Sequence, residues 1–282
     1  MNRLLAYWLL RFGKNIYKSR AFRRNLNINY LKHYLYVIDS VLNIIETKDI
    51  SRVCDNNELY WTMWLQEEQP EIVQLCLKSI KKYCKNTIVI TEKNYNNYID
   101  ISDYILQKYQ AGRIRPCFFS DYIRVCLLEK YGGTWIDGTC YLTDKVPKYI
   151  LNSEFFMLQN FEKTSLSNYF IHSKPGAFIT CVMKKFLEEY WKDNNRASDY
   201  FFFHLFILTA IKYNDIFRQE WNKIPQGLNY NTKLMYKILY DDYEPDLYDW
   251  LCKTSYLHKL TYKKHDEKNI NSNSLYRHLI TD

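Results

Sequence analysis

Two short polar clusters combine residue types that are suited to substrate binding and catalysis. Residues 120–124 (S-D-Y-I-R) place a carboxylate and a guanidinium three positions apart, and residues 137–139 (D-G-T) follow an apolar run. In a helix, Asp121 and Arg124 share one face, while Asp137 stands where a strand ends. We therefore expect both clusters to converge on one cleft.

Each cluster also has a structural interpretation. Asp137-Gly138 is a favoured type I′ turn pair, so residues 134–142 could form a β-hairpin. Asp121 would be favoured by the dipole of a helix N-terminus, with Arg124 as its i,i+3 partner. Asp199 is a candidate N-cap for the aromatic helix that follows it. These alternatives stay open at this point.

The elements around the clusters predict an α/β protein. We expect a helix over residues 120–131, with Ser120 as N-cap and Gly132-Gly133 at its end, and then a strand over 134–136. Further strands are expected at 59–65, 87–91, 154–158 and 169–172, and helices at 70–83, 99–109, 176–191 and 199–212. This alternation predicts a mostly parallel central sheet flanked by helices, with ligands beyond the carboxyl ends of its strands.

The positive charge of the chain is concentrated at its N-terminus. The formal net charge is +8, and residues 1–38 hold eight Lys or Arg and no acid, so the body from Asp39 onward is formally neutral. The apolar residues of this leader fall on one helical stripe: Leu5, Trp8, Leu9, Phe12 and Ile16. Residues 1–46 are therefore predicted to be a basic amphipathic leader that binds an anionic membrane surface through residues 1–28. The alternative is a helix packed on the body; nucleic acid, which normally calls for a basic groove, is not expected as a partner.

The remaining chain indicates a single globular body. Residues 58–264 are predicted to form one catalytic-size domain, and residues 265–282 a polar, loosely held tail. The longest later apolar run, residues 200–211, is too short to cross a bilayer, and the leader lacks the features of a signal peptide. The eight cysteines form no C-x-x-C pair, which favours buried thiols in a reducing compartment.

Several ordered motifs resemble those of a known family. S-D-Y-I-R (120–124), followed by K-Y-G-G-T-W-I-D-G-T (130–139), resembles the S-D-x-x-R and Y-G-G-x-(W/Y)-x-D-x-(D/T) core of glycosyltransferase family 32 and the related capsular polysaccharide synthesis proteins. W-T-M-W-L-Q (61–66) resembles the first strand of that family. The likeness covers about residues 59–142 and extends weakly to 199–204 and 258–263, and three ordered blocks are more specific than a lone D-x-D motif.

This resemblance implies a GT-A fold that transfers a sugar from a nucleotide-sugar, with retention of configuration and with Mn²⁺ or Mg²⁺. By the same resemblance, Trp64 stacks on the uracil ring, and Gln66 belongs to the nucleotide-sugar site. Asp121 and Arg124 would position the ribose and the donor sugar, and Arg124 would also oppose phosphate charge.

The resemblance also implies the metal and diphosphate ligands. Asp137 would hold the cation that neutralises the leaving diphosphate, with Thr139 and His258 completing the metal site. Lys259 would reach the diphosphate, and Asp199 would orient donor or acceptor. Thr139 stands where a second Asp is expected, which implies a weaker or water-mediated metal site. His258 has a structural alternative of its own.

The sequence thus predicts an enzyme that transfers a hexose, galactose or glucose, from a UDP-sugar to a lipid-linked saccharide of a capsular or other surface polysaccharide. Its predicted location is the cytoplasmic face of the plasma membrane, as a peripheral protein. The alternatives are a sugar-phosphate transferase, a host-directed glycosylating effector, and a catalytically silent membrane-bound assembly subunit.

Overall fold

The computed structural model describes residues 20–47, 58–159, 165–225, 227, 231–263 and 270–281. The chain divides into two compact units, each built from three segments. The helical unit comprises Met1–Cys54, Tyr98–Tyr131 and Pro175–Ile224, and the sheet unit comprises Asp55–Asn97, Gly132–Lys174 and Pro225–Asp282. This division does not run at residues 46 and 264, because residues 20–47 belong to the same unit as later helices.

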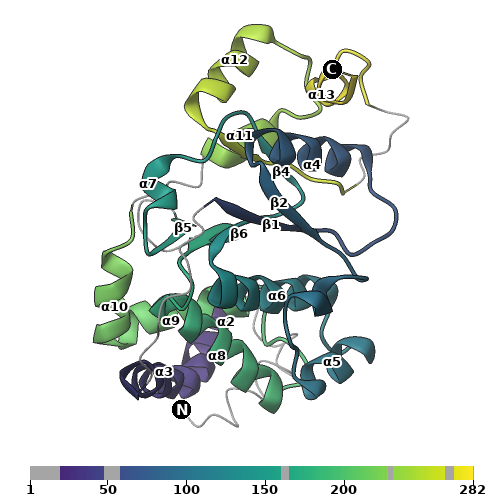
Figure 1. Cartoon of the computed structure of the whole chain (residues 1–282). Helices are drawn as coiled ribbons and strands as arrows, with labels where there is room; N and C mark the ends of the chain where they lie inside the picture. Colours follow the sequence, from purple (N-terminus) through teal and green to yellow (C-terminus); the bar gives the residue numbers. More distant parts are fainter. Residues whose placement is uncertain are drawn as a thin grey trace. The chain divides into compact units, whose positions relative to one another are not determined.

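The sheet unit contains a five-stranded sheet in the order β2-β1-β3-β6-β5 (Figure 1). Its strands are β1 (Leu59–Met63), β2 (Asn86–Ile90), β3 (Gly133–Ile136), β5 (Phe155–Gln159) and β6 (Leu166–Ser173). β1 is parallel to β2 and β3, whereas β6 is antiparallel to both β3 and β5. Four strands therefore share one direction, which confirms the expected α/β class with a mostly parallel sheet.

The D-G-T segment links this sheet to a second one. β4 (Cys140–Leu142) pairs with β7 (Leu257–Lys259), whereas β3 pairs with β1 and β6. Gly138 is not among the glycines with a positive φ angle, whereas a type I′ turn would require a positive φ at this position. The hairpin alternative for residues 134–142 is therefore excluded.

Shorter elements complete the sheet unit. They are α4 (Glu71–Tyr83), η3 (Tyr95–Asn97), α7 (Lys148–Leu151), η4 (Asn231–Lys233), α11 (Leu234–Lys237), α12 (Pro245–Thr254) and α13 (Leu275–Thr281). α4 packs against β4 and α13, and its amphipathic sequence presents Ile72, Val73 and Cys76 to a buried cluster.

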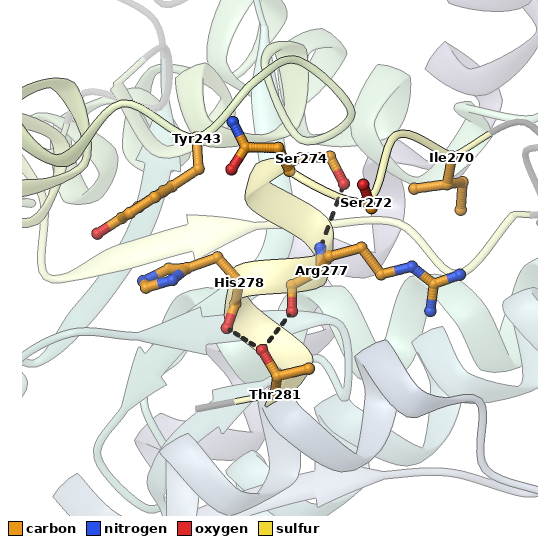
Figure 2. A pocket seen from close by; sticks show the side chains of 8 residues that line it. Tyr243, Ile270, Ser272, Ser274, Arg277, His278 and Thr281 are labelled. Carbon is orange, nitrogen blue, oxygen red and sulfur yellow. Dashed lines mark hydrogen bonds between the residues drawn. The ribbon is translucent and has the colours of Figure 1, made fainter.

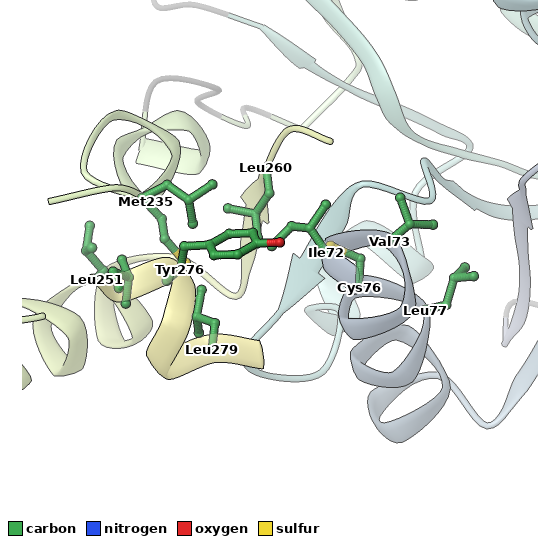
Figure 3. Packing of buried hydrophobic residues seen from close by; sticks show 11 residues of the cluster. Ile72, Val73, Cys76, Leu77, Met235, Leu251, Leu260, Tyr276 and Leu279 are labelled. Carbon is green, nitrogen blue, oxygen red and sulfur yellow. The ribbon is translucent and has the colours of Figure 1, made fainter. Parts of the chain in front are cut away.

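The C-terminal segment contributes to that cluster and is not a loose tail (Figure 3). Leu275 and Leu279 lie one helical turn apart on α13 and are 2% and 3% exposed. Tyr276 packs beside them, and its hydroxyl lies 3.2 Å from Glu71 Oε2. The prediction for residues 265–282 is therefore wrong over residues 270–281, because this polar stretch carries apolar residues at helical spacing.

The helical unit consists of α2 (Arg20–Leu31), η2 (Lys32–Leu35), α3 (Tyr36–Thr47), α5 (Asp103–Gln110), α6 (Pro116–Tyr131), α8 (Phe178–Asp193), α9 (Phe202–Tyr213) and α10 (Asp215–Asn222). α2 packs on α9, and α3 packs on α8. The Tyr30 hydroxyl donates to Asn194 Oδ1 at 2.6 Å, and Leu26 and Leu31 are buried. From residue 20 onward the leader therefore packs on the body, while the apolar stripe at residues 5–16 lies outside the described residues.

Helix α6 begins earlier than the sequence analysis predicted. Pro116 starts it, as the fixed φ of proline favours at a first helical position, so Ser120 lies inside the helix and is not its N-cap. The predicted end is confirmed, because Gly132 and Gly133 follow with φ angles of 66° and 90°. A Cβ atom on Gly133 would lie 2.3 Å from the Leu59 carbonyl oxygen, so only glycine fits there.

Within the ranges that the structure describes, no helix is both long enough and apolar enough to cross a bilayer. The cysteines in these ranges are free thiols; Cys76, Cys84, Cys126 and Cys140 are buried, whereas Cys117 is exposed.

Candidate functional site

The ends of β1 and β3 bring Trp64 next to the D-G-T turn. β1 and β3 are parallel neighbours, so the residues that follow them lie at the same edge of the sheet. A Cβ atom on Gly138 would lie 3.0 Å from the Met63 carbonyl oxygen and 3.7 Å from Trp64 Cε3. The absence of a side chain at Gly138 therefore allows the close approach of two predicted site segments.

Asp137 is held by the backbone and by two side chains. Its N–H donates to the Tyr169 carbonyl at 2.9 Å, and Trp135 Nε1 donates to Asp137 Oδ1 at 2.8 Å. Lys259 Nζ donates to Asp137 Oδ2 at 2.9 Å. The Lys259 and Asp137 side chains are 24% and 25% exposed, so this ion pair is partly desolvated but still reachable from solvent.

The pairing of β4 with β7 places Lys259 beside Asp137. Cys140 lies opposite Lys259, and the Leu260 N–H donates to the Thr139 carbonyl at 2.8 Å. Lys259 Nζ also donates to Thr139 Oγ1. The ammonium group therefore bridges the first and third residues of the D-G-T turn.

His258 does not join this cluster. Successive residues of a strand point to opposite faces, and Lys259 points to Asp137, so His258 faces away from that carboxylate. His258 is 0% exposed, and burial lowers its pKa to about 4, which keeps the ring neutral. This arrangement favours the structural interpretation of His258.

The expected metal ligands are therefore not assembled in the sheet unit. Both oxygens of Asp137 have partners, the Thr139 hydroxyl accepts from Lys259, and His258 lies on the other face. Across the described ranges, no three His, Cys, Asp or Glu side chains gather as metal ligands would. The residues present do not fit a divalent cation held by Asp137, Thr139 and His258.

Trp64 lies beside a pocket of 530 Å³. Trp64 Nε1 donates to the Glu68 carbonyl at 2.9 Å, and the ring is perpendicular to that of Tyr262, with 5.0 Å between centroids. Glu68 and Tyr262 both line the pocket, whereas Gln66 is exposed and does not line it. The ring that is predicted to bind the base thus contacts two residues of the pocket wall, although Trp64 itself does not line the pocket.

A second pocket, of 510 Å³, lies at α13 (Figure 2). Its wall includes the Tyr243 ring, which stacks on His278 with 3.6 Å between centroids. Thr281 Oγ1 donates to the Arg277 carbonyl at 2.9 Å. No residue that the sequence analysis singled out lines this pocket, so we do not include it in the candidate site.

The helical unit holds the other predicted residues. Asp121 and Arg124 share one face of α6, as expected, with 3.4 Å between Oδ1 and Nη2, and they are 7% and 4% exposed. Arg124 Nη2 also donates to Ser120 Oγ at 3.1 Å. Asp199 is not the N-cap of α9, because Phe201 holds that position; the Asp199 carboxylate accepts the Phe201 N–H at 2.9 Å in the turn before the helix. Substrate roles for these residues stay predictions.

Two residues beside Lys259, Tyr169 and Lys233, were not predicted from the sequence. The ammonium of Lys259 lies 5.3 Å from the centroid of the Tyr169 ring, and that of Lys233 lies 5.8 Å from it. Lys233 is exposed as a residue, but partial desolvation of its ammonium group lowers its pKa, and the nearby positive charge of Lys259 lowers it further. Lys233 belongs to no motif and lies beyond the last helix predicted from periodicity, so only the fold reveals its position.

Comparison with known proteins identifies a family and similar solved structures. The model of a family described as capsular polysaccharide synthesis protein matches residues 11–279. The structure titled PaToxG glycosyltransferase is similar over 72% of this chain and 84% of that chain, with 11% sequence identity and a TM-score of 0.41. No curated protein matches the sequence.

Proposed function

Because the chain belongs to the capsular polysaccharide synthesis protein family, we propose that it transfers a hexose from a UDP-sugar to a lipid-linked saccharide during surface polysaccharide synthesis. Membership of the family confirms the resemblance carried by the motifs and supports a glycosyltransferase. The UDP donor, the lipid-linked acceptor, retention of configuration and the cytoplasmic face of the membrane are parts of the proposal.

One observation carries this proposal: an aromatic ring and an ammonium group meet at the D-G-T turn. Trp64 lies against Gly138, and Lys259 bridges Asp137 and Thr139. A flat ring suits a nucleobase, and a cation suits the phosphates attached to the nucleoside. The turn follows the carboxyl end of β3, where α/β sheets bind ligands.

In the proposed reaction, the bond between the sugar C1 and the diphosphate oxygen breaks, and its electron pair leaves with UDP. The acceptor hydroxyl oxygen forms the new bond to C1, and its proton passes to the departing phosphate oxygen. Lys259 opposes the charge that develops on that phosphate, and Asp137 holds the ammonium in place. The fixed position of these groups supplies orientation, and no protein base is required for the step.

The experiment is a donor screen that measures UDP release, combined with calorimetric titration of UDP. Asp137→Asn removes the charge that holds Lys259, and we expect UDP release to fall on the order of 100-fold. Asp144→Asn is a matched control, because Asp144 is exposed and accepts only a local hydrogen bond from the Lys145 N–H.

Product analysis separates the alternatives. Hexose 1-phosphate in the product linkage would indicate a sugar-phosphate transferase, and a glycosylated protein would indicate an effector. UDP binding without any turnover would indicate a silent assembly subunit. Failure of the wild-type protein to bind UDP at all would overturn the proposal.

A further inference from the structure

Two lysine ammonium groups flank the same aromatic ring in the sheet unit. Lys259 comes from β7 and Lys233 from η4, two elements that pack together, and both reach the Tyr169 ring of β6. They are 26 positions apart in the chain, and the fold brings their charges to one place. Because like charges repel, this arrangement favours negative charge nearby, and Asp137 supplies one such charge to Lys259.

Tyr169 fixes the geometry of this cluster. Its carbonyl accepts the Asp137 N–H at 2.9 Å, and its hydroxyl shares a hydrogen bond of 2.7 Å with Thr232 Oγ1. Thr232 precedes Lys233, so the hydroxyl contact anchors the backbone that carries this second lysine. The same residue therefore orients both the D-G-T turn and η4.

The charges of the cluster leave an excess of one positive charge. Lys259 is paired with Asp137, whereas none of the acidic residues that the structure describes forms an ion pair with Lys233. Lys233 is exposed, so an incoming ligand can reach it. A diphosphate can present separate oxygens to both ammonium groups, whereas a neutral ligand would leave the excess positive charge unbalanced.

The ammonium of Lys259 lies where the sequence predicted a divalent cation. It contacts the carboxylate of Asp137 and the hydroxyl of Thr139, two of the three expected metal ligands. His258, the third expected ligand, faces the opposite side of β7 and is buried. The oxygen atoms of Asp137 and Thr139 thus suit the ammonium group of Lys259 better than a metal ion.

We propose that Lys259 and Lys233 form a diphosphate site in which two ammonium groups bind the donor without a divalent metal. This inference rests on the proposed function and names how the same site holds the UDP-sugar. Lys259 contacts the phosphates from the D-G-T side, and Lys233 contacts them from η4. Tyr169 is a positioning residue, because it contacts both the D-G-T turn and η4.

The test compares UDP with uridine by calorimetric titration, in EDTA and in Mn²⁺. We expect UDP to bind equally well in both. Lys233→Ala should weaken UDP binding about tenfold, the effect of losing one charge-assisted hydrogen bond, and leave uridine binding unchanged. Lys233→Arg should retain UDP binding because it retains the charge. Lys237→Ala is the control, since Lys237 is exposed on the adjoining α11.

The outcomes distinguish this inference from the proposed function. UDP binding that requires Mn²⁺, or a Lys233→Ala variant that binds UDP as the wild type does, would overturn the two-lysine site and leave the glycosyltransferase proposal standing. If neither UDP nor uridine binds the folded wild-type protein, the proposed function itself fails. Thermal unfolding of each variant confirms that it is folded.

Discussion

At the scale of single residues, Gly138 sets the spacing of the candidate site. It separates Asp137 from Thr139, and its missing side chain lets Trp64 and the Met63 carbonyl approach the turn. The sequence motif contains this glycine, but its favoured turn pairing with Asp137 suggested a hairpin. In the fold Gly138 does not form a hairpin turn, because the strands before and after it, β3 and β4, belong to different sheets.

Gly138→Ala should therefore weaken UDP binding several-fold. The added Cβ would lie 3.0 Å from the Met63 carbonyl oxygen, so the turn and the Met63 backbone must move apart and Trp64, the next residue, must shift with that backbone; overpacking of this kind costs about 1–3 kcal/mol of stability. Calorimetry and thermal unfolding measure the two effects. Gly112→Ala is the control: its Cβ would meet nothing within 4 Å, and its positive φ penalises stability alone. Unchanged UDP binding in Gly138→Ala would show that UDP binding does not depend on the close approach of Gly138 to Met63 and Trp64.

At the scale of elements, periodicity predicted the parts that depend on local sequence. The strand expected at 59–65 is β1 (Leu59–Met63), and the helix expected at 70–83 is α4 (Glu71–Tyr83). Alternation and helical spacing are local signals, so they need no knowledge of partners. The start of α6 was missed because Pro116 and Ser120 are both acceptable near a helix N-terminus.

Features that depend on pairing between distant segments could not be predicted in this way. Lys259 and His258 were both expected at the site, but only the register of β7 against β4 decides which of them faces Asp137. Lys233 reaches the cluster because η4 packs on β7, and no local pattern records that contact. Thus the motifs singled out Asp137, whose role in the reaction stays a prediction, whereas only the fold shows which side chains surround it.

The C-terminal helix offers a test at this scale. Leu279→Ala should lower the free energy of unfolding by about 2–5 kcal/mol, because Leu279 is 3% exposed within the cluster that α13 shares with α4. Thr281→Ala on the same helix is the control, since Thr281 is exposed. Urea unfolding measures both variants. Equal stability of Leu279→Ala and the wild type would mean that α13 does not belong to the core.

At the scale of the whole molecule, the structure separates the basic leader into two parts. Four of its eight basic residues lie in residues 1–19, and the other four lie in residues 20–38, where the helices pack on α8 and α9. Leu26 and Tyr30 in that second part are buried. Charges there are fixed to the body, so the predicted attachment to a membrane depends on residues 1–19.

Two truncations test this division. Removal of residues 1–19 should abolish co-sedimentation with vesicles containing phosphatidylglycerol and leave UDP release unchanged, because the apolar stripe and four cations are lost while α2 stays whole. Removal of residues 1–28 should in addition lower the unfolding temperature, because it deletes most of α2, including the buried Leu26. Vesicles of phosphatidylcholine alone are the control, since they lack the negative charge that the leader requires. Retained binding to the anionic vesicles after removal of residues 1–19 would refute the assignment of membrane binding to those residues and would place the attachment surface on the folded body.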